Sequence, residues 1–302
     1  MSTINDLPME LRANDIQRHI INIDTRFRDN PDLSTSSNFY FTLPTTIRNI
    51  LRVRLTSLEF PDNFYFWTAA KQNVTIRLIY CQPPSTTPIL LPITIPDGNY
   101  TPQSMIAAIT AIFTAAGVDT IFSVAFDATN GKFTFTSTGV KFAIDTTYNS
   151  INRKFDYGLG YFIGFTYGLH KSVQISPSEA EVVSDLTSSF TGNNYLLLCL
   201  NDYYCVNHSF WGNTIQAFAK LVLKAGKDLM EFDDYAGDHI KEIVFQGPQD
   251  LCRFKVQLLD PYGQLVNMVG TNYSFSIEIL EIKNINLYNV LRDSLGIRWL
   301  NA

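Results

Sequence analysis

The stretch ILRVRLTSLEF at residues 50–60 changes the parity of its apolar positions halfway along. Val53 and Leu55 alternate with arginines, which is the period of a half-buried β-strand. The apolar residues that follow, up to Phe60, occupy positions of the other parity. Because a slip of one residue moves every side chain to the opposite face, we predict a β-bulge near residues 56–58. One strand with a single buried face then runs through the whole stretch.

Similar runs of β-branched and aromatic residues gather in two blocks of the chain, 38–91 and 169–284. Turn-forming Pro, Asn and Asp residues bound them, as is typical of strands. Many short strands in two blocks predict a mainly β protein, a single jelly-roll β-sandwich. The runs are FYFTLP, ILRVRLTSLEF, VTIRLIY, YLLLCLN, FAKLVLK, KEIVFQ, CRFKVQLLD and YSFSIEILEI.

The segment between these blocks, residues 92–168, has a different pattern. Thr101 can cap a helix, Pro102 suits its first position and Gly117 can close it, so we predict a helix from Pro102. Next comes FSVAFDATNGKFTFTST at 122–138, where two alternating runs flank Asn-Gly and predict a β-hairpin. We therefore expect an inserted α+β subdomain here.

The composition limits the classes of partner. Charged residues make up 17% of the 302 residues and aromatic residues 13%, which favours a large core or a surface covered by other proteins. The net charge of −5 provides no basic surface for phosphate contacts, so we expect no direct nucleic acid partner. The longest apolar run, 105–118, is shorter than the roughly 20 residues of a membrane-spanning helix. The sequence therefore indicates a soluble protein with no membrane span.

The residues that usually carry catalysis or bind metal are scattered. The four histidines are far apart, and none are spaced at i, i+2 or i, i+4, as a metal enzyme of the cupin type would require. There is no G-x-S-x-G motif, the cysteines lack zinc-site spacing, and the acidic stretch 231–238 does not match a calcium loop. We expect no catalytic, cofactor or metal site, although a cupin-type enzyme and a carbohydrate-binding or receptor-binding jelly roll remain alternatives. The histidines are His19, His170, His208 and His239.

Charge is concentrated in INIDTRFRDNPD at residues 21–32. Residues 1–37 show no sustained periodicity of apolar residues, so we predict an extended N-terminal arm in which only residues 21–23 form a short strand-like piece. No His, Cys or Gly-rich element lies beside the charges, whereas arginines readily pair with carboxylates or carbonyls of another surface. We predict that the arm binds a neighbouring subunit and adds little to the stability of the monomer. The interface candidates are Asp24, Arg26, Arg28 and Asp29 of the arm together with Arg52 and Arg54.

At the other end, residues 285–302 form a separate C-terminal tail in this interpretation. The stretch INLYNVLRDSLGIRWL begins it, and we predict a short helix whose apolar face carries Leu287, Val290 and Leu291.

Several of these motifs together resemble a known family. They are I-x-I-D-[ST]-R-[FY]-R-D at 21–29, S-x-x-F-x-x-x-L-P at 36–44, and a looser R-x-x-x-L-x-S-x-E-x-P ending at Pro61, in which Arg52 or Arg54 fills the basic position. P-D-G-N-Y-T at 96–101, and D-x-Y-G followed by S-F-x-I-E-I near the end, add to the likeness. The sequence resembles the minor capsid and penton proteins of nucleocytoplasmic large DNA viruses and virophages.

The resemblance implies a non-enzymatic jelly-roll subunit of an icosahedral shell. A penton protein closes the five-fold vertices as a homopentamer among trimers of the major capsid protein, often with an inserted domain facing outward. The alternative within the family is a minor capsid protein that cements major capsid trimers from beneath. Either would belong to the virion and assemble in the cytoplasm of the host cell.

Overall fold

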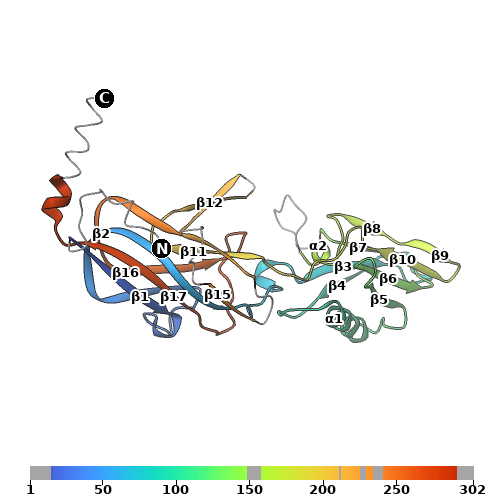
Figure 1. Cartoon of the computed structure of the whole chain (residues 1–302). Helices are drawn as coiled ribbons and strands as arrows, with labels where there is room; N and C mark the ends of the chain where they lie inside the picture. The colour runs from blue at the N-terminus through green and yellow to red at the C-terminus, as the bar shows by residue number, and fades with distance from the viewer. Residues whose placement is uncertain (1–14, 148–157, 211, 225–228, 234–240, 291–302) are drawn as a thin grey trace, which may run out of the picture. The chain divides into compact units, whose positions relative to one another are not determined.

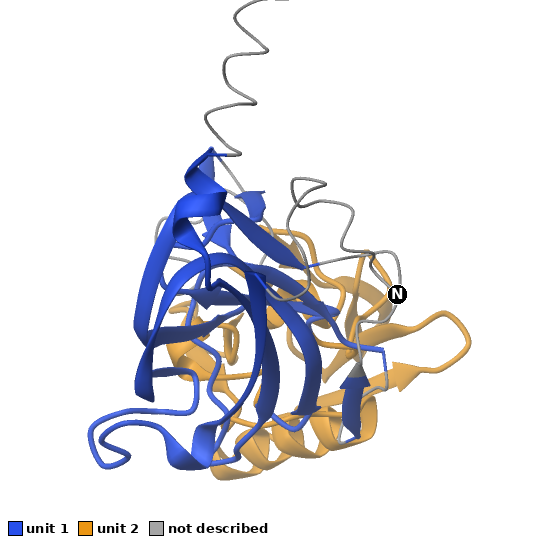
Figure 2. Ribbon diagram, turned by 60° about the vertical axis from the view of Figure 1, so that its left-hand side comes forward, with its two compact units in different colours: residues 1–64, 193–302 blue, residues 65–192 orange. Residues whose placement is uncertain are grey.

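The computed structural model describes residues 15–147, 158–210, 212–224, 229–233 and 241–290. The chain divides into two compact units (Figure 2). Unit 1 is formed by residues 1–64 and 193–302, and unit 2 by residues 65–192. Unit 2 is thus inserted between two halves of unit 1.

Unit 1 is built on one curled antiparallel sheet (Figure 1). Its central strand β2 is 24 residues long, and it pairs with β16 along residues 38–54 and with β17 along residues 50–59. Changes of register at several points let these long strands bend. The sheet order is β1 (Ile16–Asp24), β17 (Ser274–Ile282), β2 (Asn38–Pro61), β16 (Glu242–Leu259), β11 (Tyr195–Leu200) and β14 (Ala219–Val222), and β15 (Met230–Asp233) also pairs with β2.

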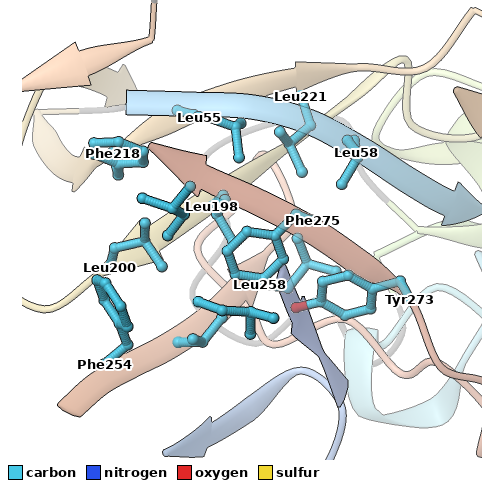
Figure 3. Close-up of a cluster of buried hydrophobic side chains, with 14 of the residues drawn as sticks. Leu55, Leu58, Leu198, Leu200, Phe218, Leu221, Phe254, Leu258, Tyr273 and Phe275 are labelled. Carbon is cyan, nitrogen blue, oxygen red and sulfur yellow. The ribbon is translucent and has the colours of Figure 1, made fainter. Parts of the chain in front are cut away.

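The curled sheet encloses one hydrophobic core (Figure 3). Side chains from β1, β2, β11, β14, β16 and β17 meet in it, so strands far apart in the sequence cover each other's apolar faces. Burying each large side chain of this kind contributes about 1.5–3 kcal/mol. The expected mainly β, jelly-roll type of sandwich is therefore the fold of unit 1. The labelled members in Figure 3 are Leu55, Leu58, Leu198, Leu200, Phe218, Leu221, Phe254, Leu258, Tyr273 and Phe275.

The predicted bulge in β2 is confirmed. Ser57 pairs with Ser276, whereas the next residue of β17, Ile277, pairs with Leu55, so Thr56 is the extra residue. The change of register keeps the apolar residues on both sides of Thr56 pointing into the core, and Leu55 and Phe60 are both fully buried.

The N-terminal segment is more ordered than an arm. β1 covers nine residues, and all nine pair with β17. Ile23 is 0% exposed and belongs to the core. The extended piece predicted at residues 21–23 was therefore too short, because the strand covers residues 16–24. The polar residues that alternate with isoleucine in this stretch fit an edge strand with one solvated face, and residues 1–14 lie outside the described residues.

Smaller elements complete unit 1. A 3-10 turn, η3 (Thr25–Phe27), follows β1, and β12 (Val206–Phe210) forms a hairpin with β13 (Asn213–Ala217). Residues 285–290 are helical, and Leu287 and Tyr288 pack beside Leu51 and Ile282. Of the apolar face predicted for this tail, Val290 is 65% exposed, and Leu291 lies outside the described residues.

Unit 2 is larger than the predicted insertion over 92–168. β3 pairs with β4 and β7, not with the sheet of unit 1, and β8 to β10 also pair within unit 2. Assigning VTIRLIY at 74–80 to the jelly roll was therefore wrong, because a short apolar strand carries no sign of which sheet it joins. The two four-stranded sheets are β4 (Ile89–Thr94), β3 (Thr75–Tyr80), β7 (Phe142–Asp145), β8 (Leu169–Lys171) and β5 (Phe122–Asp127), β6 (Lys132–Thr138), β10 (Glu179–Val183), β9 (Val173–Ser176).

The helical and hairpin predictions within unit 2 are confirmed. Helix α1 spans Pro102–Ala115, and Thr101 caps it together with Ser104 in a capping box. Gly117 follows with φ +68°, a conformation that ends helices. β5 and β6 form the predicted hairpin around Asn-Gly. A second helix, α2 (Leu159–Phe162), and a 3-10 turn, η4 (Ala69–Lys71), complete the unit.

Candidate assembly surface

We find no cluster of three or more His, Cys, Asp or Glu side chains that could hold a metal ion in the part of the chain that the structure describes. Three histidines have structural contacts: His19 with Glu281, His170 with Asp185 and the carbonyl of Thr166, and His208 with the carbonyl of Pro261. His239 and most of the acidic stretch 231–238 lie outside the described residues.

The buried cysteine is unsuited to nucleophilic chemistry. Burial raises the pKa of the Cys199 thiol to about 11, so little thiolate is present at neutral pH. Burial also raises the pKa of Cys205. Among the described helices, none is long and apolar enough to cross a membrane. What the described surface does offer is charged and apolar side chains around the loop that joins β1 to β2.

Asp24 and Arg26 form the first part of this loop. Asp24 is 6% exposed and accepts a hydrogen bond from the backbone N–H of Arg26 at 2.9 Å, which caps the 3-10 turn. The Arg26 guanidinium donates from Nε to the same carboxylate at 2.9 Å. The hydrogen bonds from Arg26 hold the pKa of Asp24 below its usual value, although burial opposes them. Two of the predicted interface residues are therefore partners of each other.

Arg28 holds the rest of the loop in shape. Its Nη1 donates to the carbonyl of Thr25 at 2.8 Å, its Nη2 donates to the carbonyl of Pro31 at 3.2 Å, and its Nε donates to Ser34 Oγ at 3.2 Å. A contact of 3.4 Å to Asn272 Oδ1 ties the loop to the start of β17. The N–H groups of the planar Arg28 guanidinium therefore form hydrogen bonds within the subunit, two of which go to backbone carbonyls.

Asp29 connects the loop to the edge of β2. Its backbone N–H donates to the carbonyl of Tyr40 at 2.8 Å. Its carboxylate accepts from the N–H of Thr42 at 3.2 Å and from the Thr42 hydroxyl at 2.6 Å. Asp29 thus bonds to one outward-facing backbone group at each of two alternate positions of the edge, as a paired strand would otherwise do.

Arg52 and Arg54 lie apart from the loop, on the face of β2 that points away from the core. Arg52 donates to Glu278 Oε1 at 2.9 Å, and its Nε lies 3.8 Å from Glu242 Oε2. Arg54 stands directly between Glu242 and Glu278 in the sheet register. The side chains of Arg52, Glu278 and Glu242 are only 11%, 14% and 19% exposed. The sequence showed the arginines but not their partners, which come from strands about 200 residues away.

Apolar residues of the same region are more exposed than the charged candidates. Phe27 is 72% exposed beneath the Arg26 guanidinium, and Leu33 is 91% exposed. Ile20 on β1 is also 72% exposed. These residues were not among the predicted interface residues, although large apolar residues inside a turn-rich stretch are a signal for a contact surface.

A groove adjoins this surface. It has a volume of about 470 Å³, and β1 lines it from His19 to Asn22 while β2 lines it with Phe41, Leu43, Pro44, Thr45 and Ile47. Leu43 and Ile47 are buried, and Phe41 and Ile21 are packed against the core. The floor of the groove is therefore the apolar edge of the core itself.

Two of the solved structures that the chain resembles come from virophages. The chain matches no protein-family model, and no curated protein matches it. The mavirus penton protein, solved in selenomethionine form, aligns with 88% of this chain and 99% of its own at 10% identity and a TM-score of 0.47. A chain in the cryo-electron microscopy structure of the Sputnik virophage aligns with 88% of this chain and 98% of its own at 12% identity and a TM-score of 0.41. Because both TM-scores are below 0.5, we draw no functional conclusion from these likenesses.

Proposed function

We propose that this protein is a non-enzymatic structural subunit of an icosahedral virus shell and that it closes the five-fold vertices as a homopentamer. The observation that carries the proposal is the combination of a jelly-roll unit with motifs of capsid proteins mapped onto it. I-x-I-D-T-R-F-R-D spans the end of β1 and the loop, and the motif ending at Pro61 lies in β2. The motifs thus occupy the edge of the sheet at which the exposed apolar residues gather.

The structure of the loop supports a role in contacts between subunits. The side chains of Asp24, Arg28 and Asp29 form hydrogen bonds that hold the loop in one conformation. A loop that is pre-organised in this way loses little conformational freedom when it binds. It presents Phe27 and Leu33 to solvent, and aromatic and aliphatic anchors carry most of the energy of protein interfaces. The Arg26 guanidinium, whose side chain is 66% exposed, is placed to bind at the rim.

Five-fold closure requires a heterologous contact, in which one patch of a subunit meets a different patch of the next. We assign the loop surface to one side of this contact. Of the six predicted interface residues, Asp24, Arg28 and Asp29 then act by holding the loop, and Arg26 acts by touching the neighbour. Arg52 stabilises the subunit by pairing with Glu242 and Glu278, and Arg54 lies opposite the same two residues in the sheet register. Trimers of the major capsid protein are the proposed partners around the vertex.

The experiment that tests the proposal is a cryo-electron microscopy reconstruction of the particle that contains this chain. Density for the chain at the vertices, five copies at each, is the expected result. Density beneath the facets would reject the penton role and leave the cementing role between major capsid trimers. Native mass spectrometry of the cross-linked purified protein is the complement, and a species of five times the 34.2 kDa subunit mass is expected.

A second experiment tests the loop. Phe27→Ser and Leu33→Ser together should leave the melting temperature of the subunit nearly unchanged, because both side chains are exposed. Incorporation into particles should fall. A matched control, Val173→Ser and Ile175→Ser, changes two exposed apolar residues of unit 2. Equal loss of incorporation in both variants would show that the effect is not specific to the loop.

A further inference from the structure

We propose that residues 7–11 of a second copy of this chain bind in the groove between β1 and β2, adding a strand to the free edge of β1. The inference rests on the proposed assembly of the chain with copies of itself and identifies one contact of that assembly. Three observations carry it: the open edge of β1, the apolar floor of the groove, and the alternating pattern of the segment.

The first observation is the edge. Among the described residues, β1 pairs with β17 alone. The N–H of Thr25 donates to Tyr273, and the carbonyl of Asp15 accepts from Lys283, so the odd-numbered residues bond to β17. Alternate residues of an antiparallel strand point their backbone groups to opposite sides. The N–H and carbonyl groups of Arg18, Ile20 and Asn22 therefore point away from β17, and Ile20 and Asn22 line the groove.

The second observation is what faces this edge. The opposite wall of the groove contains Pro44, which has no N–H, and before it Asp29 already bonds to the Tyr40 carbonyl and the Thr42 N–H. An incoming strand can form a ladder with β1 but not with this wall. Its inward side chains would lie on Phe41, Leu43 and Ile47, which are apolar. The groove is therefore suited to an extended segment with one apolar face, the mode of recognition called β-augmentation.

The third observation is a segment that fits. Residues 7–11 read LPMEL, in which Leu7, Met9 and Leu11 alternate with Pro8 and Glu10. This is the period of a strand with one apolar face. The segment belongs to residues 1–14, which precede β1 and lie outside the described residues.

The register favours a second copy over the same chain. Only three residues separate Leu11 from Asp15, which already pairs with β17. A segment that folded back from such a short turn would place Leu11 beside the beginning of β1, whereas the groove lies at residues 19–22. Met9 and Leu11 would then miss the apolar floor. A segment from another copy has no such restriction and can set all three apolar side chains over the groove.

The test uses the full chain. One variant of the full chain, called the host protein here, combines Leu7→Glu, Met9→Glu and Leu11→Glu, so that its own segment 7–11 no longer competes for the groove. A fluorescent peptide of residues 4–14 is added to this host protein. Saturable binding by fluorescence anisotropy is expected. Ile20→Pro in the host removes one outward N–H and should weaken binding about tenfold. Ile20→Ala keeps that N–H and is the matched control, with little expected change.

Two results would overturn the inference at this stage. One is no binding of the peptide to the host protein. The other is binding that Ile20→Pro does not weaken. If Ile20→Pro fails to fold, as circular dichroism would show, the same question is answered by a peptide that carries the three glutamates, which should not bind the host.

Cross-linking separates the two possible sources of the segment. A chain with Met9→Cys is mixed with a chain of different mass with Asn22→Cys, both with Cys205→Ser and Cys252→Ser. A disulfide-linked heterodimer is expected, and Ser123→Cys in place of Asn22→Cys is the control for random collision. Binding by a second copy would be overturned by two results together. The Met9→Cys and Asn22→Cys chains would form no more heterodimer than the control pair, and a single chain that carries both cysteines would form an intramolecular disulfide. Particles that still incorporate the chain in that case would show that the capsid role stands and only the groove inference fails.

Discussion

Ile23→Ala provides a direct test of whether β1 belongs to the folded subunit. Ile23 is 0% exposed and lies in the core beside β17, so the substitution removes three buried carbon atoms and leaves a cavity. At about 0.8 kcal/mol for each carbon plus the cavity term, the free energy of unfolding should fall by about 2–5 kcal/mol. Ile20→Ala, three residues earlier on the same strand but 72% exposed, is the matched control and should change it by less than about 0.5 kcal/mol.

The assay is urea unfolding followed by circular dichroism, combined with hydrogen–deuterium exchange to locate the change. Exchange should accelerate in β1 and β17 and stay unchanged in unit 2, because the core cluster that contains Ile23 consists of unit 1 residues. Equal unfolding free energies for Ile23→Ala and Ile20→Ala would refute the reasoning and restore an arm that adds nothing to the monomer. Deletion of residues 1–14 alone, by contrast, should leave the melting temperature nearly unchanged, as the sequence analysis expects of the arm.

Three further results are expected. Hydrogen bonds from Arg26 lower the pKa of Asp24 in the folded state. The stabilisation of the folded state by these bonds is therefore fully present above the unfolded-state pKa of 3.8 and is lost as pH falls through the folded-state pKa. Asp24→Asn should accordingly reduce the dependence of the melting temperature on acid pH. Gly164→Ala should destabilise unit 2 by at least about 1 kcal/mol, because φ is +95° and the new Cβ would meet a backbone carbonyl, and exchange rates there report it. Iodoacetamide near neutral pH should modify the exposed Cys252 before Cys199, whose pKa is about 11, and mass spectrometry gives the order.

The parts of the fold that the sequence predicted are those encoded over short distances. The bulge at Thr56 was visible because the parity of apolar residues changes within one strand. Helix α1 was visible because Thr101 and Gly117 mark its two ends. The boundary of unit 2 was not, because β3 looks the same whether it joins one sheet or another. Pairing between distant strands is a tertiary property that local pattern does not contain.

The lack of information about distant strand pairing also explains why the partners of the predicted interface residues could not be foreseen. The concentration of charge in 21–32 drew attention to this stretch, but charge alone does not tell whether a side chain binds its own subunit or a neighbour. Arg54 is flanked by Glu242 and Glu278 only because β16 and β17 both pair with β2 in a particular register. A shift of one residue in either strand would turn these carboxylates toward the core. The exposed Phe27 and Leu33, between the charges, are the better indication of a contact surface.

The concentration of charge in the loop has a structural reason that does not require catalysis. Strand edges expose unpaired backbone groups, and proteins cover or interrupt them to prevent unwanted pairing. Here Thr35 pairs with Asn38, Asp29 bonds to the Tyr40 carbonyl and the Thr42 N–H, and Pro44 lacks an N–H, so fewer backbone groups remain for another strand along the first half of the β2 edge. Arg28 and Asp24 hold the loop that does this. Within the described ranges, β1 beside it pairs with β17 alone. This difference between the two edges is the reason for placing the proposed contact with a second copy in the groove between β1 and β2.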